Sequence, residues 1–286
     1  MTIRTSAIIP VTRMNGRLAH IERMLKNPYS KSLEFIISHD VADDFTSSEL
    51  HDLKNLNPNI KLIEKRFGSP GLARNAGLEI AKGEWIVFWD SDDDPLIEEF
   101  IKMIDITDRM GLVAGIGDYQ AINELDNSIF ESSPNGELSK LYTNVGLWRM
   151  CFRRDRIKDL RFTEFRMAED QIFFAQLELK VSEVHFHKKS VYTYFFGSSG
   201  HLTQDYSAVL DLRGASALLM SFLSKDPSNR NLLKMFLKQK MTLVRRIRAE
   251  NRFREIYITF RELLIIKCSP SDLFYSINSA LRKTLK

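Results

Sequence analysis

Short apolar runs alternate with segments of helical spacing over the first two-thirds of the chain. The apolar runs predict buried strands at 7–11, 35–37, 60–63, 85–89 and 112–116. Apolar residues recurring every three or four positions predict helices near 18–25, 73–81 and 97–104. Strands that alternate with helices are typical of an α/β fold with a mostly parallel sheet flanked by helices.

The later part of the chain follows a different pattern. Residues 117–150 are less periodic and predict a long excursion with some strand. A helical face follows at 172–179, and two apolar runs at 184–187 and 191–194 predict a late hairpin or strand pair. After about residue 206 the pattern is wholly helical, and Pro227 and Pro270 divide it into three segments. We therefore predict an α/β domain over 1–205 and a C-terminal helical region over 206–286.

Composition narrows the class of protein. With 44% hydrophobic and 27% charged residues and a mean hydropathy of −0.22, the chain is typical of a globular protein rather than a collagen-like or disordered one. We see no apolar run near the roughly 20 residues that span a bilayer, and no secretory block at the N-terminus. Two cysteines, Cys151 and Cys268, form neither a disulfide framework nor a zinc site between them. We expect a cytoplasmic protein.

Charge is distributed unevenly along the chain. Residues 224–286 carry 15 lysines and arginines against 5 acids, a net charge of +10, whereas the whole chain carries +4. A basic tail on an acidic body predicts an anionic partner for the tail. The alternative is a solvated helical face that acids elsewhere balance.

A basic stripe is expected in the tail. If residues 230–252 form one helix, the residues that share a stripe opposite the apolar side are Arg230, Lys234, Lys238, Arg245, Arg248 and Arg252. Such a helix favours peripheral attachment to an anionic membrane surface. Its apolar face could instead pack on the α/β domain or on a second subunit, which leaves a homo-oligomer open. No aromatic platform accompanies the charge, which argues against nucleic acid as a partner.

Four aspartates follow the strand at 85–89: Asp90, Asp92, Asp93 and Asp94. Ligands of open α/β sheets bind at the carboxyl ends of the strands, and clustered carboxylates need a cation or donor groups. Hard oxygen ligands suit Mg²⁺ or Mn²⁺, with phosphate oxygens completing the shell. A calcium loop is excluded, because Pro95 and Ile101 stand where it needs Gly and an acid. A dehalogenase-type phosphatase loop is excluded by Asp93, which stands where that loop needs Thr or Val. A plain solvated acidic turn stays open.

The motifs resemble those of the family 2 glycosyltransferases of the GT-A fold. The residues that carry the resemblance are GSPGLARNAGL at 68–78, AKGEWIVFWDSDD at 81–93, EFIISHD at 34–40, AEDQIF at 168–173 and VYTY at 191–194 followed by two serines. The first strand is similar to the family's as well. The resemblance covers about residues 6–203, with five motifs in the family's order and spacing.

The resemblance implies a GT-A domain over 1–205 with a nucleotide-binding half, about 1–116, and an acceptor half, about 117–205. It implies an inverting, non-processive transferase that moves one sugar from a nucleoside diphosphate, a UDP-sugar first, to a glycan or lipid-linked acceptor. Mn²⁺ or Mg²⁺ would be the cofactor. We expect a role in bacterial surface polysaccharide or lipopolysaccharide assembly, on the inner face of the cytoplasmic membrane.

The same resemblance gives the donor-side residues their roles. Pro10 and Asp40 would line the nucleotide site, with Asp40 accepting from the base. Asp90 and Ser91 would contact the ribose and the phosphates. Asp92, with Asp90, would hold the metal, and a late histidine, His201, is a further ligand in some members. Asp40 could instead cap its turn.

Three further residues complete the donor side. Arg74 would balance diphosphate charge or order the nucleotide loop; alternatively, it is a structural ion-pair partner. Asp93 would anchor the acidic turn, and Asp94 would be solvated.

On the acceptor side, Asp170 matches the family's general base, which takes the proton of the attacking hydroxyl. Glu169 and Trp148 are the expected acceptor contacts. Simple helix capping for Asp170 and core packing for Trp148 stay open. Two other functions remain: a GT-A-fold nucleotide-sugar-binding or scaffold protein without turnover, and a nucleotidyl- or phosphotransferase that uses the same acidic turn.

Overall fold

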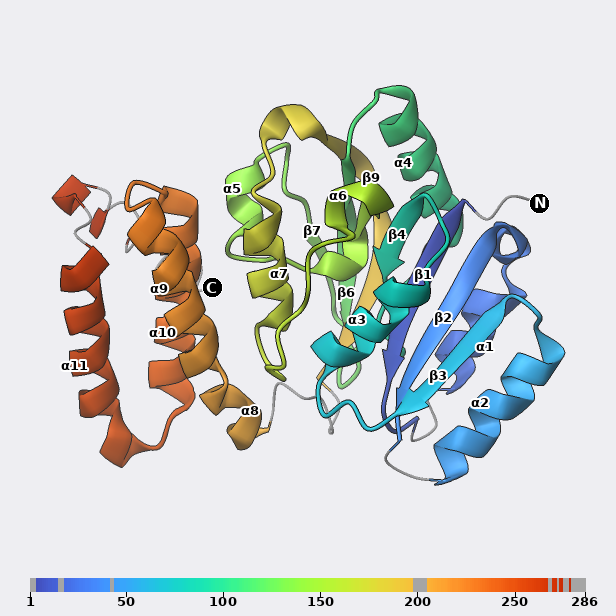
Figure 1. Ribbon diagram of the computed structural model, residues 1–286, viewed down its shortest axis with the longest axis horizontal. Helices are drawn as coiled ribbons and strands as arrows, with labels where there is room; N and C mark the ends of the chain where they lie inside the picture. The colour runs from blue at the N-terminus through green and yellow to red at the C-terminus, as the bar shows by residue number, and fades with distance from the viewer. Residues whose placement is uncertain are drawn as a thin grey trace. The chain divides into compact units, whose positions relative to one another are not determined.

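The computed structural model describes residues 4–14, 18–41, 44–197, 205–266, 269–271, 273–274 and 278 (Figure 1). Contacts between residues divide the chain into two compact units. The first unit is Met1–Glu137, Gly146–Glu164 and Leu179–Ser199, and the second is Leu138–Val145, Phe165–Glu178 and Gly200–Lys286. The predicted boundary at residue 205 does not coincide with this division, because two segments from the predicted α/β domain group with the C-terminal helices.

The first unit contains a nine-stranded sheet in its described part. Its strand order is β3-β2-β1-β4-β8-β6-β9-β5, with β7 on β6. The strands are β1 (Thr5–Val11), β2 (Leu33–Asp40), β3 (Ile60–Lys65), β4 (Trp85–Phe88), β5 (Asp94–Pro95), β6 (Ala114–Asn123), β7 (Ile129–Ser132), β8 (Met150–Arg153) and β9 (Val184–Phe196). Pairs β1–β2, β1–β4, β2–β3 and β6–β9 are parallel, while β8 is antiparallel to both neighbours. The predicted α/β class is confirmed.

Helices cover both faces of this sheet. Those of the first unit are α1 (Leu18–Lys26), α2 (Asp44–Leu56), α3 (Pro70–Ile80), α4 (Ile97–Arg109) and α6 (Arg154–Ile157), with 3-10 turns at Pro28–Ser32, Leu147–Arg149 and Val181–Glu183. Apolar residues of α1, α2 and α4 share one core with alternate residues of β1, β2 and β4. Helix α3 packs on the other face, where a Cβ on Gly77 would lie 2.5 Å from Ile8 Cγ2. Because central strands are covered on both faces, they are apolar at nearly every position.

The late hairpin prediction is wrong. Residues 184–196 form one strand, β9, which pairs with β6 along its length. The register shifts between Gly117 and Tyr119, where β9 inserts extra residues around Lys188 and Lys189. This bulge places two charges in the middle of an apolar pattern, which is why the sequence suggests two strands.

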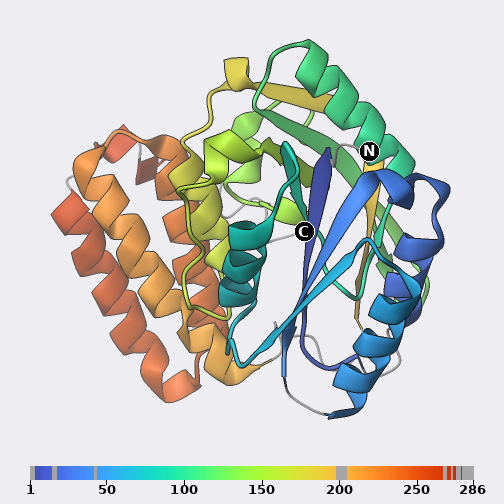
Figure 2. The same cartoon turned by 45° about the vertical axis from the view of Figure 1, so that its right-hand side comes forward.

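The second unit is helical. Its helices are α5 (Leu138–Leu141), α7 (Glu169–Leu177), α8 (Tyr206–Leu210), α9 (Leu212–Lys225), α10 (Arg230–Arg246) and α11 (Ala249–Ile266). Helix α9 ends just before Pro227, as expected. The next break falls at Ile247–Arg248 rather than at Pro270, so the expected helix over 230–252 is two helices. Helices α9, α10 and α11 lie side by side in both views (Figures 1 and 2).

The expected basic stripe on a single helix is also wrong. Lys234 is 5% exposed, and Lys238, which donates to the backbone carbonyl of Thr143, is partly buried. Arg248 and Arg252 lie beyond the end of α10. Buried ammonium groups on α10 therefore bind polar partners within the second unit instead of facing solvent.

One described segment is long and apolar enough to cross a bilayer, contrary to the sequence expectation. It is Tyr206–Lys225, through α8 and α9, with a mean hydropathy of 1.2 and 39% of that stretch buried. A helix buried in a protein core meets the same criterion, and α9 packs on α10, so the segment is weak evidence for a membrane span.

Candidate functional site

The acidic turn lies where three parallel strands end together. Ile8 of β1 is level with Phe88 of β4, and the Trp89 N–H donates to the Ile8 carbonyl at 3.1 Å. Pro10 pairs with residue 38 of β2, just before Asp40. Because the three strands are parallel, Pro10, Asp40 and the turn that begins after Trp89 share one edge of the sheet. The structure thus brings these predicted site residues to one place, and their roles in binding stay predictions.

Arg74 forms an ion pair with the turn. It lies on α3, a helix whose N-cap is Ser69, and its Nη2 is 2.8 Å from Asp90 Oδ1. Arg74 is 8% exposed, and its guanidinium lies 5.5 Å from the centre of the Phe162 ring. The ion-pair alternative is therefore realised, and it neutralises one carboxylate of the crowded turn.

Asn75, which the sequence analysis did not single out, fixes the neighbouring loop. Its amide donates to the Phe162 carbonyl and accepts from the Phe162 N–H, both at 2.9 Å. Its place beside Arg74 in the ARN motif was the available signal. The motif thus supplies one residue to the turn and one to the loop that carries Phe162.

Asp40 holds the loop that leads into α3. Its two carboxylate oxygens accept from the backbone N–H groups of Phe67, at 2.8 Å, and Gly68, at 2.9 Å. Each oxygen of a carboxylate has a second acceptor position, and Asp40 is partly exposed at the sheet edge. The carboxylate therefore shapes the loop and can still accept from a ligand.

Asp93 anchors the turn from inside, as predicted. It is 1% exposed, and its Oδ1 accepts from the Phe195 N–H at 2.8 Å. Burial raises the pKa of Asp93 well above its usual value, and the charges of Asp90 and Asp92 raise it further. Burial and the neighbouring charges therefore both oppose ionisation of this anchor.

Tyr192, for which no role was predicted from the sequence, connects this anchor to the turn. Its fully buried hydroxyl accepts from the Asp90 N–H at 3.0 Å and donates to Asp93. Its ring stacks on Trp148 with 4.6 Å between centroids. The repeated tyrosines of the VYTY motif were the only signal.

The contacts of two neighbouring residues, Asp94 and Trp148, bear on what the sequence predicts for them. Asp94 is not simply solvated: His20 Nδ1 lies 2.9 Å from its Oδ1, and Arg23 donates to both of its oxygens. Trp148 is partly buried between Tyr192 and Tyr194, whose ring is 5.5 Å away. Trp148 therefore packs against the core while part of its side chain stays exposed, and its contact with an acceptor stays a prediction.

The donor set of the turn suits a hard divalent cation. Asp90 and Asp92 supply two carboxylates separated by one residue. A bound cation would reduce the electrostatic repulsion between them. Among the described residues, no group of three or more His, Cys, Asp or Glu side chains is arranged to hold a metal. His201 lies outside the described residues. The turn thus fits Mg²⁺ or Mn²⁺ only if a ligand such as a diphosphate supplies further oxygens.

A sequence model described as Glycosyl transferase family 2 matches residues 6–168. The chain belongs to this family. The resemblance inferred from the motifs is confirmed.

Curated relatives of this family 2 member are named as glycosyltransferases. Poly(ribitol-phosphate) beta-glucosyltransferase of Bacillus spizizenii is 26% identical over 232 residues, 77% of this chain and 36% of that protein. Glycosyltransferase GlyA of Streptococcus pneumoniae is 23% identical over 214 residues, 67% of this chain and 30% of that protein. The chain thus spans about a third of the length of these relatives.

Solved structures confirm the GT-A fold. Residues 1–349 of Staphylococcus aureus TarS in complex with UDP-GlcNAc superpose with a TM-score of 0.68 at 18% identity, covering 89% of this chain and 79% of that one. The mannosyltransferase PcManGT from Pyrobaculum calidifontis, in complex with GDP-Man and Mn²⁺, gives a TM-score of 0.50 at 14% identity, covering 99% and 75%.

Asp170 and Glu169 belong to the second unit of the family 2 chain, at the start of α7. The N-cap is Ala168, with φ of 70°, so Asp170 is not the cap, and its Oδ1 accepts from the next N–H at 2.8 Å. Glu169 is 7% exposed. Burial lowers the pKa of Lys238 on α10, and the charge of Asp170 opposes this shift. Asp170 and the Lys238 ammonium group therefore lie close enough to interact within the second unit.

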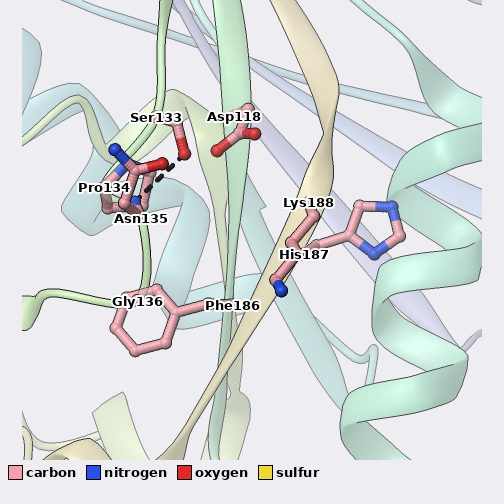
Figure 3. A pocket seen from close by; sticks show the side chains of 8 residues that line it. All are labelled: Asp118, Ser133, Pro134, Asn135, Gly136, Phe186, His187 and Lys188. Atoms are coloured by element: carbon pink, nitrogen blue, oxygen red, sulfur yellow. Dashed lines mark hydrogen bonds between the residues drawn. The ribbon is translucent and has the colours of Figure 1, made fainter.

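A cavity of about 360 Å³ lies elsewhere in the first unit, on β6 and β9 (Figure 3). Asp118 and Lys188 line it, together with the loop at 133–136. His187, which also lines it, lies 3.3 Å from Glu99 through its Nε2. Of the residues predicted for the donor, metal and acceptor sites, none lines this cavity.

Proposed function

We propose that this chain transfers a single sugar from a UDP-sugar to a glycan or lipid-linked acceptor in surface polysaccharide assembly. The observation that carries the proposal is the Asp90-Ser91-Asp92 turn, held by Arg74 at the sheet edge that also presents Asp40. The names of the relatives support a polymer acceptor, and the UDP-GlcNAc complex of TarS supports a UDP-sugar donor.

In this proposal, Asp92 and Asp90 hold Mn²⁺ or Mg²⁺ together with diphosphate oxygens of the donor. When bound, such a cation offsets the negative charge that grows on the departing nucleoside diphosphate. Arg74 already neutralises part of the charge on Asp90. Asp40 and Pro10 would line the base, and Ser91 would contact the ribose or the phosphates.

Asp170 acts as the general base, and the transfer inverts the anomeric centre. The acceptor hydroxyl oxygen attacks the anomeric carbon, its proton passes to the Asp170 carboxylate, and the bond to the diphosphate oxygen breaks with its electrons. Asp170 lies near Lys238 within the second unit. Glu169, beside it, contacts the acceptor.

A donor-hydrolysis screen over UDP- and GDP-sugars tests the proposal, because slow hydrolysis needs no acceptor. Asp92→Asn is expected to lower hydrolysis and transfer by at least 100-fold, and EDTA is expected to abolish both. Asp170→Asn is expected to abolish transfer while nucleotide binding persists. Asp94→Asn is the matched control, since it removes a carboxylate that bonds His20 and Arg23.

Several results would contradict the proposal. Full activity of Asp92→Asn, or full activity in EDTA, would rule out the metal's role at the turn. Nucleotide-sugar binding without hydrolysis or transfer would identify a binding or scaffold protein instead. Once an acceptor is found, the anomeric coupling constant of the product shows whether the configuration is inverted.

A further inference from the structure

Helix α11 presents an apolar stripe to solvent. Phe253, Tyr257, Phe260 and Leu264 are spaced by four, three and four residues, so they share one face of the helix. Their side chains are 85%, 62%, 62% and 64% exposed. Ile256 widens the same face and is half exposed. Exposed aromatic and aliphatic side chains in a continuous row are uncommon on a protein that stays in water.

The acidic side chains of α11 explain this orientation. Glu255 is 1% exposed, and its carboxylate binds Lys240 of α10 at 3.3 Å and Arg213 of α9 at 3.0 Å. Glu262, two turns later, lies 2.7 Å from the same Lys240. A buried ammonium group without these partners would be costly, so the two glutamates turn toward α10. The opposite face of the helix, which carries the aromatic residues, therefore faces outward.

Cationic side chains flank the stripe. At 100° per residue, Arg254 and Arg261 lie on one side of it, and both are exposed. Arg252 lies on the other side and is also exposed, but its guanidinium donates to the carbonyls of Ile247 and Arg245. The Arg261 guanidinium lies 6.0 Å from the centre of the Tyr257 ring. The two acidic side chains that the structure describes on α11, Glu255 and Glu262, both bind Lys240 on the opposite, buried side of the helix. The outward surface thus combines an apolar centre with a positive rim.

We propose that α11 binds an anionic lipid bilayer, with the apolar stripe in the boundary between headgroups and acyl chains and the arginines at the lipid phosphates. An apolar face with a basic rim is the chemistry of an interfacial helix, and long arginine side chains reach phosphates from such a position. A second copy of the chain is disfavoured, because pairing two such faces would bring the positive rims together. The attachment predicted from the sequence is thereby assigned to α11 rather than α10.

Vesicle co-sedimentation of the full chain tests this assignment without any donor sugar. Binding is expected to vesicles containing phosphatidylglycerol, to be weak on pure phosphatidylcholine, and to fall with added salt. Phe253→Ser combined with Phe260→Ser is expected to weaken binding at least tenfold. Arg254→Gln combined with Arg261→Gln is expected to weaken it about fivefold per arginine. Leu125→Ser, at a residue 77% exposed in the first unit, is the matched control and should bind as the parent does.

Three outcomes would overturn the assignment. The first is that the parent chain does not bind anionic vesicles, and the second is that the double phenylalanine variant binds them as well as the parent does. The third is that light scattering shows a dimer of the parent chain and a monomer of this variant. Donor hydrolysis in solution should be unchanged in the α11 variants. Failure here therefore leaves the proposed transferase function standing, and the reverse also holds.

Discussion

Removing the hydroxyl of Tyr192 should loosen the acidic turn without changing the packing around it. In Tyr192→Phe, the Asp90 N–H loses its acceptor at 3.0 Å, and Asp93 loses a donor. The ring that stacks on Trp148 is kept. Tyr194→Phe is the control, because its ring also stacks on Trp148, whereas no bond from its hydroxyl to the turn occurs in the described part of the chain.

The structure sets the size of the effect. Each of the two buried hydrogen bonds of the phenol contributes about 1 kcal/mol, and the groups left unpaired add to the loss, so we expect about 2 kcal/mol. With a urea dependence of roughly 3 kcal/mol per M for a domain of this size, the unfolding midpoint should fall by about 0.7 M. A looser turn should also weaken the binding of UDP with Mn²⁺ about tenfold.

Tryptophan fluorescence is a direct assay, because all three tryptophans, Trp85, Trp89 and Trp148, lie in the first unit. Urea unfolding of the parent and both variants gives the midpoints, and titration calorimetry gives the affinity for UDP with Mn²⁺. Equal midpoints for Tyr192→Phe and Tyr194→Phe would refute the hydrogen-bonding argument. An unchanged UDP affinity together with a lowered midpoint would show that the phenol stabilises the sheet but does not position the turn.

Three further predictions concern the first unit. Gly77→Ala should destabilise it by about 1–3 kcal/mol in urea unfolding, since the new Cβ would lie 2.5 Å from Ile8 Cγ2; an unchanged midpoint would mean that α3 shifts freely. Burial raises the pKa of the Cys151 thiol to about 12, so in a chain whose other cysteine is replaced, a thiol reagent at pH 8 should label it only after unfolding. Burial also raises the pKa of Glu34, but hydrogen bonds from Lys61 and two other donors outweigh this and lower the pKa overall. Glu34→Gln should therefore cost about 2 kcal/mol at pH 7, a difference that shrinks as the pH falls below about 4.5; a pH-independent difference would exclude the charge as its cause.

The sequence by itself determined the class of the fold and the position of the acidic turn. Both depend on patterns within short segments: apolar runs that are covered on both faces, helices between them, and four aspartates directly after Trp89. Parallel pairing then places the strand ends at one edge, which brings Pro10, Asp40 and Asp90 together. Their assignment to a nucleotide site came from the family resemblance and stays a prediction.

Only the tertiary structure decided how these residues are held. The turn at 90–93 is bonded to β9, a strand about a hundred residues later: Tyr192 accepts from the Asp90 N–H, and Asp93 accepts from the Phe195 N–H. The pairing of β5 with β9 brings these two segments together. The sequence left two roles open for Arg74, a contact with the diphosphate and a structural ion pair, and only the structure shows its ion pair with Asp90. Such contacts depend on sheet register, which no local pattern fixes.

The helical region shows the same limit. Periodicity predicted helices but placed the solvent-facing side of the tail on basic residues, whereas Lys234 and Lys240 are buried and Phe253 is exposed. The free energy of burying a lysine depends on whether a carboxylate is there to pair with it. Glu255 supplies one from the next helix, and that pairing turns the aromatic face of α11 outward. Helical spacing fixes which residues share a face, and only packing between helices fixes which face is inside.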